Sequence, residues 1–467
     1  MSELLEAAAP NPSGPNPSGQ DVIRRVLHRR DLILFGLVIV GPTAVYPVYG
    51  IIQTAAHGQA ALSYLVAMVA MLFTATSYGR MSSVYPSAGS TYTYVQQTFN
   101  PYIGFLAGWA MILDYFLLPL IGIILPALTA ARLVPSIPYS LWVIFFTVGI
   151  TIINVLGIRT LAKANTVMMI AMTFVMILFI GLAIRYVAIH HGVASLASIT
   201  GIYIPGNFSA APIMLGASIA ALSYIGFDAI STLAEDSVNP GKDIGFATVV
   251  VCLIQTAICI ATVYFAALAW NNYHSFTHIE TAILDIGSRI GGEVMFLILT
   301  AVLVVSGVSC ALTGQAGASR LMFAMGRDGV IPHSLFGRLH PRFGTPTRAI
   351  YISSVALLIT ALLSSYQLAV ETLNFGAFIG FILVNLSVIQ HFFVTRKQRS
   401  GRALLNNLLV PLAGAVVCGY VWINLDMQAK TAGFIWLGIG ILYLAFQTRG
   451  FKSAPSKWSS VQPKCCE

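Results

Sequence analysis

The stretch LILFGLVIVGPTAVYPVYGIIQTA, residues 32–55, is apolar along almost its whole length but carries Gly41, Pro42 and Thr43 in its middle. A run of this length can cross the roughly 30 Å of hydrocarbon in a bilayer as a helix. Proline removes an amide donor and disfavours helix at the residue before it. An unpaired amide is costly in lipid, so such an interruption is tolerated only beside a polar cavity or other protein. The stretch therefore predicts a membrane-spanning helix that is broken at Gly41 to Ala44.

A second apolar stretch, PIMLGASIAALSYIGFDAISTLA at residues 212–234, has a comparable interruption at Ser223, Tyr224, Ile225 and Gly226. The first break opens one set of five apolar runs and the second opens the next five. An odd number of crossings inverts the second set relative to the first, which is the pattern of an inverted repeat with a binding site near the bilayer midplane. The alternative is that glycine and proline merely kink two membrane helices, where both residues are common.

Composition places the whole chain in a membrane. The 467 residues are 57% hydrophobic and 9% charged, whereas soluble domains carry about 25% charged residues. We predict an all-α polytopic membrane protein of about a dozen spans, with no separate soluble domain. The predicted spans are residues 32–55, 60–80, 103–131, 139–157, 167–187, 212–234, 246–270, 294–325, 349–364, 367–394, 404–425 and 432–446.

These spans divide the chain into four parts. Tandem NPSG pieces in the first 30 residues are turn-forming and predict a disordered arm. The ten spans of the two repeats predict a transport core, and the last two spans predict peripheral helices. The expected divisions are a cytoplasmic arm at 1–30, a core at 31–394 with repeats at 31–188 and 210–394, peripheral helices at 395–449 and a cytoplasmic tail at 450–467.

Basic residues concentrate on one side of the predicted spans. With the amino terminus inside, all but four of the 25 lysine and arginine residues lie on the inner side, the exceptions being Arg132, Arg185, Arg289 and Lys430. Because cytoplasmic loops carry the excess of basic residues, this asymmetry predicts that both termini are cytoplasmic. The net charge of +9 then follows from topology. A nucleic-acid partner is not expected, since it would need the charges gathered on one soluble face.

Six strings resemble the amino acid, polyamine and organocation transporter superfamily, and within it the putrescine importers of bacteria. They are SYGRMSSVYPSAGSTYTYVQQ at 77–97, GFLAGWAMILDY at 104–115, GFDAISTLAEDSVNP at 226–240, ASRLMFAMGRDGVIP at 318–332, HPRFGTP at 340–346 and LNFGAFIGFILVNLSVI at 373–389. The resemblance implies a LeuT-type core of ten helices, with spans one and six discontinuous, plus two peripheral helices. It also implies alternating access and uptake across the bacterial inner membrane, coupled to protons or to membrane potential.

Two positions depart from the pattern of the superfamily. Many of its amino acid carriers have a GSG-type turn in span one whose amides hold the substrate carboxylate, whereas this chain has GPTAVYP at 41–47. Pro42 offers no donor, which weakens the case for an α-amino acid without excluding it. Met172 stands where some members carry a lysine in span five that substitutes for a sodium ion. The coupling ion is therefore left open by the resemblance.

Few charged residues lie within the spans, and an ionisable group in the bilayer normally faces the interior of the bundle. Asp114 in span three and Asp228, two residues after Gly226, are the main candidates. Asp114 is either a substrate ligand or a structural hydrogen-bonding group. Glu371 is expected to be an interfacial surface carboxylate. Glu235 and its neighbour Asp236 are expected to form a cytoplasmic gate or to pair with basic loops.

This chemistry suits an organic amine. A diamine such as putrescine carries two ammonium groups and no carboxylate, so its site needs carboxylates, free carbonyls or aromatic faces at two ends. For each aromatic residue, core packing is the alternative. The candidate substrate-binding residues are Gly41, Pro42, Thr43, Ala44, Tyr46, Trp109, Asp114, Tyr115, Ser223, Tyr224, Ile225, Gly226 and Asp228, and the candidates for coupling or gating are Leu222, Asp228 and Glu235.

Other function classes find little support in the sequence. The alternative within transport is a proton-coupled symporter or exchanger of amino acids. An enzyme would need a nucleophile or metal constellation, and HExxH, GxSxG and cysteine-rich ligand sets are absent from the sequence. An ion channel would need a pore loop or a ring of charges. We therefore expect a carrier that is not an enzyme and has no cofactor or metal, with protons as the coupling ion. The oligomeric state is left open.

Overall fold

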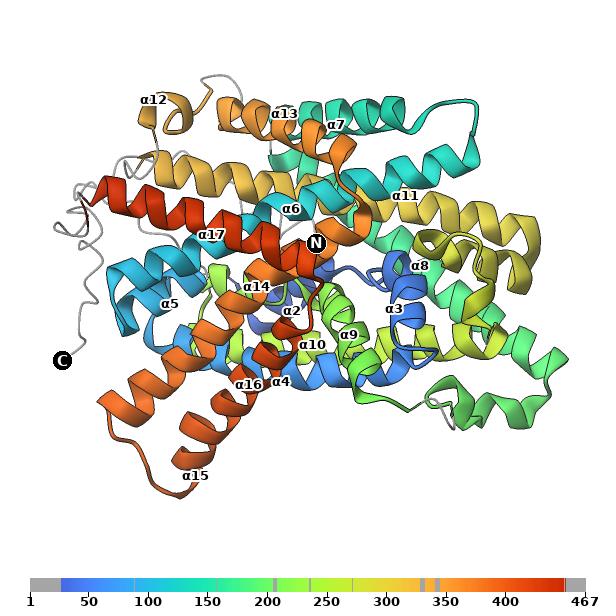
Figure 1. The fold of residues 1–467 in the computed structure, drawn as a ribbon, viewed down its shortest axis with the longest axis horizontal. Helices are drawn as coiled ribbons and strands as arrows, with labels where there is room; N and C mark the ends of the chain where they lie inside the picture. The colour runs from blue at the N-terminus through green and yellow to red at the C-terminus, as the bar shows by residue number, and fades with distance from the viewer. Residues whose placement is uncertain are drawn as a thin grey trace.

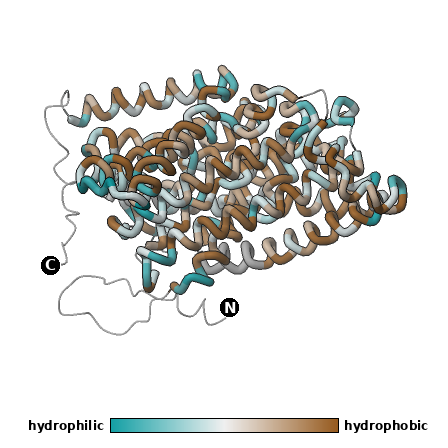
Figure 2. The backbone as a smooth tube through the Cα atoms, turned by 90° about the horizontal axis from the view of Figure 1, so that it is seen from below, coloured by the Kyte–Doolittle hydropathy of each residue, from teal (hydrophilic) through white to brown (hydrophobic). Residues whose placement is uncertain are grey.

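The computed structural model describes residues 27–450 except 88, 157, 205–207, 235–236, 271, 328–331, 341–344 and 449. The described chain is a bundle of long helices (Figure 1). Hydrophobic residues run along the helices, and hydrophilic residues gather mostly towards their ends (Figure 2). Many of the exposed side chains are large and apolar, among them Phe174, Leu442 and Phe446. An apolar outer surface on long helices is what a hydrocarbon solvent requires.

Ten described helices are long and apolar enough to cross a membrane, and Thr347–Leu363 is a shorter apolar helix. The predicted number of about twelve includes this helix and the first span, which is broken into pieces too short to count alone. The helices of the spans are α2 (Arg29–Val40) with α3 (Tyr49–Ala55), α4 (Ala60–Val84), α6 (Pro101–Leu133), α7 (Tyr139–Leu156), α8 (Ile158–His190), α9 (Ala210–Ala220) with the 3₁₀ helix η5 (Asp228–Leu233), α10 (Pro240–Ala269), α11 (Ala282–Arg327), α13 (Thr347–Leu363), α14 (Tyr366–Val388) with the π-helix η8 (Ile389–Thr395), α16 (Val410–Ile423) and α17 (Met427–Gln447). The protein is a multi-pass integral membrane protein with an all-α fold.

Two of the spans are discontinuous, as the sequence predicts. In the first, α2 ends at Val40 and helical structure resumes at Tyr46. In the sixth, α9 gives way to a 3₁₀ turn at Ala221–Tyr224 and then to η5. The fold therefore places non-helical backbone within two apolar spans.

Helices at matching positions of the two predicted sets pack against one another. The second span, α4, packs along the seventh, α10; the third, α6, packs along the eighth, α11; and the fourth, α7, packs along the ninth, α13. The pieces of the first span likewise contact those of the sixth, α3 against α9 and α2 against η5. Every one of these partners is five spans away along the chain.

Small residues allow the closest of these approaches. A Cβ on Gly79 of α4 would lie 2.4 Å from the Cα of Gly245 on α10, so the two backbones touch. The same holds between α6 and α11, because a Cβ on Gly122 would lie 2.5 Å from the backbone nitrogen of Ala311. Interfaces of small residues let membrane helices gain van der Waals contact along their backbones.

Polar side chains add specific bonds between three helices. Asn154 of α7 donates to Gln315 of α11 at 2.8 Å, and Gln315 donates to Ser354 of α13 at 2.6 Å. Thr151 on α7 also lies 2.7 Å from Ser354. All four residues are buried, and buried amides in a membrane bundle need such partners.

Parts of the helical structure differ from the predicted spans. The short helix α5 (Ser90–Thr98) lies in a segment between two predicted spans, where serine, threonine and glutamine residues give the chain little apolar character. Helix α11 begins at Ala282, well before the predicted residue 294, and it contains Gly292 at a non-helical φ of 68°. The acidic and basic residues before Gly292 lower the hydropathy of this segment, so the first part of α11 was not predicted as membrane-spanning.

Candidate substrate site

The first break is built on a left-handed glycine. Gly41 has φ 75° and ψ 128°, a conformation that costs a residue with a Cβ much more than it costs glycine. Its carbonyl accepts from the Ala44 amide at 3.2 Å and from Nε2 of Gln255 on α10 at 3.2 Å. A Cβ built at Gly41 would meet no heavy atom within 4 Å. The break is therefore held by partners on one side and borders open space on the other.

The second break has its own positive-φ glycine. Gly226 has φ 110°, and a Cβ there would lie 2.3 Å from Cγ2 of Ile39 at the end of α2. The turn is closed by local bonds, from the Ile225 amide to the Leu222 carbonyl at 3.1 Å and from the Phe227 amide to the Tyr224 carbonyl at 3.2 Å. Only glycine fits both the dihedral angle and the approach of Ile39.

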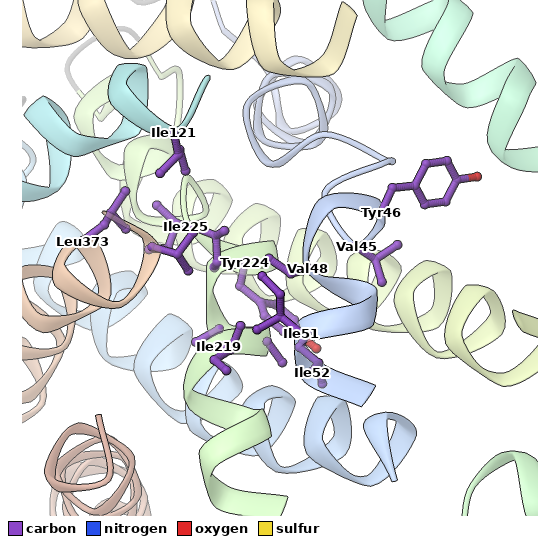
Figure 3. Packing of buried hydrophobic residues seen from close by; sticks show 14 of the residues in the cluster. Val45, Tyr46, Val48, Ile51, Ile52, Ile121, Ile219, Tyr224, Ile225 and Leu373 are labelled. Carbon is purple, nitrogen blue, oxygen red and sulfur yellow. The ribbon is translucent and has the colours of Figure 1, made fainter. Parts of the chain in front are cut away.

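Both breaks meet inside the bundle. Oγ of Ser223 lies 3.4 Å from the Ala44 carbonyl, to which it donates, and 2.8 Å from the hydroxyl of Tyr64 on α4. Val48, which follows the first break, belongs to the same cluster of buried residues as Tyr224 and Ile225 of the second (Figure 3). Residues nearly 180 positions apart in the sequence are thus hydrogen-bonded to each other. The predicted proximity of the two interruptions is confirmed.

One buried carboxyl group, Asp228, follows the second break, and a second, Asp114, lies within electrostatic reach of it. Asp114 on α6 and Asp228 at the start of η5 are each 4% exposed, and the two groups interact electrostatically. The carboxylate of Asp228 accepts from the backbone amides of Gly226, Ala229 and Asp228 itself. Oδ1 of Asp114 is buried without a hydrogen-bond partner among the described residues. Within the described chain, neither carboxylate takes part in an ion pair with lysine or arginine.

Two further atoms of the predicted set are buried without partners in the described structure, the hydroxyls of Thr43 and Tyr46. Native proteins pair nearly all of their buried polar atoms, so unpaired ones ask for an explanation such as an unfilled ligand site. The Tyr46 ring packs on the ring of Phe179 on α8, with the two ring centroids 5.5 Å apart. It points away from Tyr224 and Ile225 (Figure 3). Tyr46 therefore lies on a different side of the first break from these residues.

The remaining predicted residues are placed as follows. Tyr115 faces Gly317 of α11 and interacts electrostatically with both Asp114 and Asp228. The hydroxyl of Tyr224 is 2.9 Å from that of Thr256 on α10, so its polar atom is already occupied. Pro42, Ile225 and Leu222 are buried in the bundle. Glu235, expected to take part in gating, lies outside the described residues, as does Asp236.

Trp109 is not brought to the breaks. Its ring stacks on Trp436 of the peripheral helix α17 with centroids 4.8 Å apart, and its Nε1 donates to the Trp436 carbonyl at 2.9 Å. Trp436 returns the same bond to the Trp109 carbonyl at 2.9 Å. Trp109 therefore fastens α17 to α6, which is the packing role that the sequence left as the alternative.

Glu371 is buried, although the sequence predicts an interfacial surface carboxylate at this position. Only 1% of its surface is exposed. It accepts from the Asp426 amide at 2.9 Å and from Nε2 of Gln367 at 2.9 Å. Its carboxylate thus joins α14 to the loop between α16 and α17. Hydropathy places Glu371 at the end of a span. That the loop between α16 and α17 covers this end follows only from the packing of the peripheral helices.

Three residues near the breaks did not emerge from the sequence. Tyr64 bonds Ser223, Gln255 bonds the Gly41 carbonyl, and Tyr78 on α4 lies close enough to Asp228 to interact with it electrostatically. Tyr78 also bonds Thr91 of α5 at 2.5 Å. Tyr64 and Gln255 are isolated polar residues within predicted membrane spans, and Tyr78 lies in the stretch 77–97 that resembles the superfamily. Their positions as polar residues in the middle of apolar spans could have identified them as candidates.

Comparison with known proteins agrees with this architecture. The family model described as amino acid permease matches residues 32–444. The low-affinity putrescine importer PlaP of Escherichia coli K12 is 33% identical over 444 aligned residues, covering 94% of this chain and 97% of PlaP. The branched-chain amino acid permease BcaP of Bacillus subtilis is 29% identical, covering 91% of this chain and 94% of BcaP. The BcaP of Lactococcus lactis is 27% identical over similar shares, 91% and 95%. The chain therefore belongs to the amino acid permease family of membrane transporters.

Proposed function

We propose that this permease is a secondary active carrier that imports a small organic amine, putrescine or a related polyamine, into a bacterial cell. The observation that carries the proposal is the pair of buried, electrostatically interacting carboxyl groups, Asp114 and Asp228, the second of which follows a helix break. Family membership supports transport in general, and the name of the 33% identical relative, PlaP, supports an amine in particular.

The charge of the site favours a cation with two ammonium groups. Each buried carboxylate is costly within a bilayer unless a counter-charge is present. Within the described residues no ion pair supplies one to Asp114 or Asp228. A diamine would bring one ammonium to each carboxylate, and the unpaired Oδ1 of Asp114 would accept a hydrogen bond from it. The unpaired hydroxyl of Thr43, in the first break, is a further partner for the substrate.

An amino acid is the second candidate, because BcaP of two bacteria also resembles the chain along most of its length. Its carboxylate would need donors at a break. Pro42 has no amide hydrogen, and the amides of Gly226 and Ala229 already donate to Asp228. A substrate carboxylate would also be repelled by Asp114 and Asp228. These contacts favour the amine over the amino acid.

We further propose how the carrier is coupled and gated. Proton or membrane potential drives uptake, and Asp228 takes either a substrate ammonium or the coupling proton. Leu222 and Glu235 contribute to gating on either side of the second break. The two breaks belong to repeats at 31–188 and 210–394, whose core the helices after residue 395 flank.

A competition assay tests the substrate. Right-side-out vesicles are prepared from cells that produce the chain, and they contain no amine at the start of the assay. Uptake of labelled putrescine should be inhibited by unlabelled putrescine and spermidine, and much less by arginine or leucine. Stronger inhibition by leucine or arginine than by putrescine would replace the amine with an amino acid. Vesicles from cells that do not produce the chain supply the background of uptake that does not depend on it.

A further inference from the structure

A cavity of about 400 Å³ lies between α4, α10 and η8. None of its lining residues belongs to either helix break, so it is separate from the proposed substrate site. Gly79 and Gly245, where the backbones of α4 and α10 touch, form part of its lining. The remaining wall combines a cation, Arg80, with apolar groups of Val249 and Phe392.

Arg80 has donor capacity that the described protein does not use. Its guanidinium carbon lies 4.4 Å from the centre of the Phe392 ring. Its Nε is buried without a hydrogen-bond partner, and the two ion pairs of the described structure belong to Arg29 and Arg132. A guanidinium group offers a planar fork of donors that matches the oxygens of a phosphate. The cavity is therefore lined by a cation that lies on an aromatic ring and that no carboxylate of the described residues pairs.

The residues that line this open cavity extend from the helix ends along α4 and α10. Arg80 stands four residues before the end of α4 at Val84, which corresponds to about 6 Å along the helix axis. Val249 stands nine residues after the start of α10 at Pro240, which corresponds to about 14 Å. Since Gly79 and Gly245 touch, these two helix ends lie on the same side of the protein. Arg80 thus lies nearer the helix ends and Val249 deeper along the helices, as the headgroup and an acyl chain of a lipid would require.

We propose that this cavity is a binding site for an acidic phospholipid. The phosphate would receive hydrogen bonds from Arg80, beside the Phe392 ring, and an acyl chain would lie along Val249. Two further basic residues are close to the lining in the chain, since Lys242 follows Gly241 and Arg396 follows the end of η8. Such basic surroundings at the end of the helices favour a lipid with net negative charge over a zwitterionic one. A free phosphate ion would leave the apolar wall unused.

Thermal unfolding of the purified full-length protein in detergent tests the site. Phosphatidylglycerol, phosphatidylcholine with the same acyl chains, and inorganic phosphate are titrated separately while tryptophan fluorescence is recorded. Phosphatidylglycerol should raise the midpoint more than either of the others. Arg80→Gln should raise its half-saturating concentration about five- to tenfold, and Arg80→Lys should raise it less, because the charge remains without the fork.

Arg289→Gln is the matched control, because Arg289 also lies over an aromatic ring, that of Trp270 at 5.0 Å, but outside the cavity. Its response to phosphatidylglycerol should equal that of the unaltered protein. Val249→Phe should fill the apolar part and weaken the response while Arg80 is intact. Equal stabilisation of the unaltered protein and Arg80→Gln, or equal effects of the two lipids, would overturn the proposal. An equal effect of inorganic phosphate would replace the lipid with a free anion.

Discussion

At the scale of single residues, Asp114 and Asp228 are two buried carboxyl groups in different situations. Backbone amides of the second break donate to Asp228, whereas Oδ1 of Asp114 has no partner in the described structure. Asp228 is thus fixed before a substrate arrives, and Asp114 has bonding capacity left for one. The two residues should therefore respond differently to neutral substitution.

Asp114→Asn should weaken putrescine uptake with little effect on folding. The substitution removes the counter-charge of one desolvated ammonium, so we expect the concentration for half-maximal uptake to rise about 30-fold or more. Glu293→Gln, at an exposed position on α11, is the control and should behave as the unaltered protein. Unchanged apparent affinity in Asp114→Asn would assign this carboxyl to the internal structure of the bundle.

Asp228→Asn separates binding of the amine from coupling. If Asp228 pairs with an ammonium, half-maximal uptake and counterflow exchange should both require much more putrescine. If it carries the coupling proton, exchange should persist while accumulation against a gradient is lost, because a permanently neutral side chain mimics one titration state. Wild-type affinity together with wild-type pH dependence would exclude both roles.

At the scale of the elements, the glycine of the second break is the most constrained position. Gly226→Ala would place a Cβ at φ 110° and 2.3 Å from Cγ2 of Ile39. We expect a loss of about 1–3 kcal/mol from the dihedral angle and a displacement of α2 from η5. The measurement is the unfolding midpoint together with putrescine uptake.

Gly181→Ala is the control for this variant. Gly181 lies in α8, where a Cβ would meet no heavy atom within 4 Å, and its φ is not positive. Alanine there should leave stability unchanged or raise it by up to about 1 kcal/mol. A Gly226→Ala protein as stable and active as Gly181→Ala would show that the break does not depend on glycine.

The helix breaks could be predicted from sequence because their cause is local. Gly41 with Pro42, and Gly226, act through backbone dihedrals and missing donors, and these effects need no partner to be recognised. The direction of a side chain on an apolar helix is a different problem. Trp109 and Asp114 stand on one helix, and hydropathy does not tell which face meets α17 and which meets the breaks. Trp109 was therefore expected at the site, and Tyr64 and Gln255 were not.

At the scale of the whole molecule, the alternation of spans and loops was predictable, whereas the covering of one part by another was not. Glu371 shows the difference, because its burial depends on the loop before α17. Such contacts join segments that are far apart in the chain, so they cannot be predicted from composition or hydropathy. The helix α5 was missed for a related reason, since it packs on α6 without being apolar enough to cross a bilayer.

The orientation of the molecule remains a prediction with a direct test. Single cysteines in a cysteine-free background at Arg338 and Arg396, both exposed, should resist an impermeant thiol reagent in whole cells, because basic loops face the cytoplasm. A cysteine at Ala194, exposed between α8 and α9, should be labelled. All three should react once the cells are opened. Labelling of Arg338→Cys as efficient as that of Ala194→Cys in intact cells would reverse the topology.

The anchoring of Asp228 to the backbone of the second break has an electrical consequence. If that segment reorients during transport, its negative charge moves with it through the membrane field, where one elementary charge is worth about 2.3 kcal/mol per 100 mV. A carrier loaded with a dication would be neutral at Asp114 and Asp228, whereas an empty carrier in which Asp228 has not taken up a proton would return with a net negative charge. A potential that is negative inside would then accelerate the outward return step. Putrescine uptake should accordingly rise with an imposed potassium diffusion potential, even without a proton gradient.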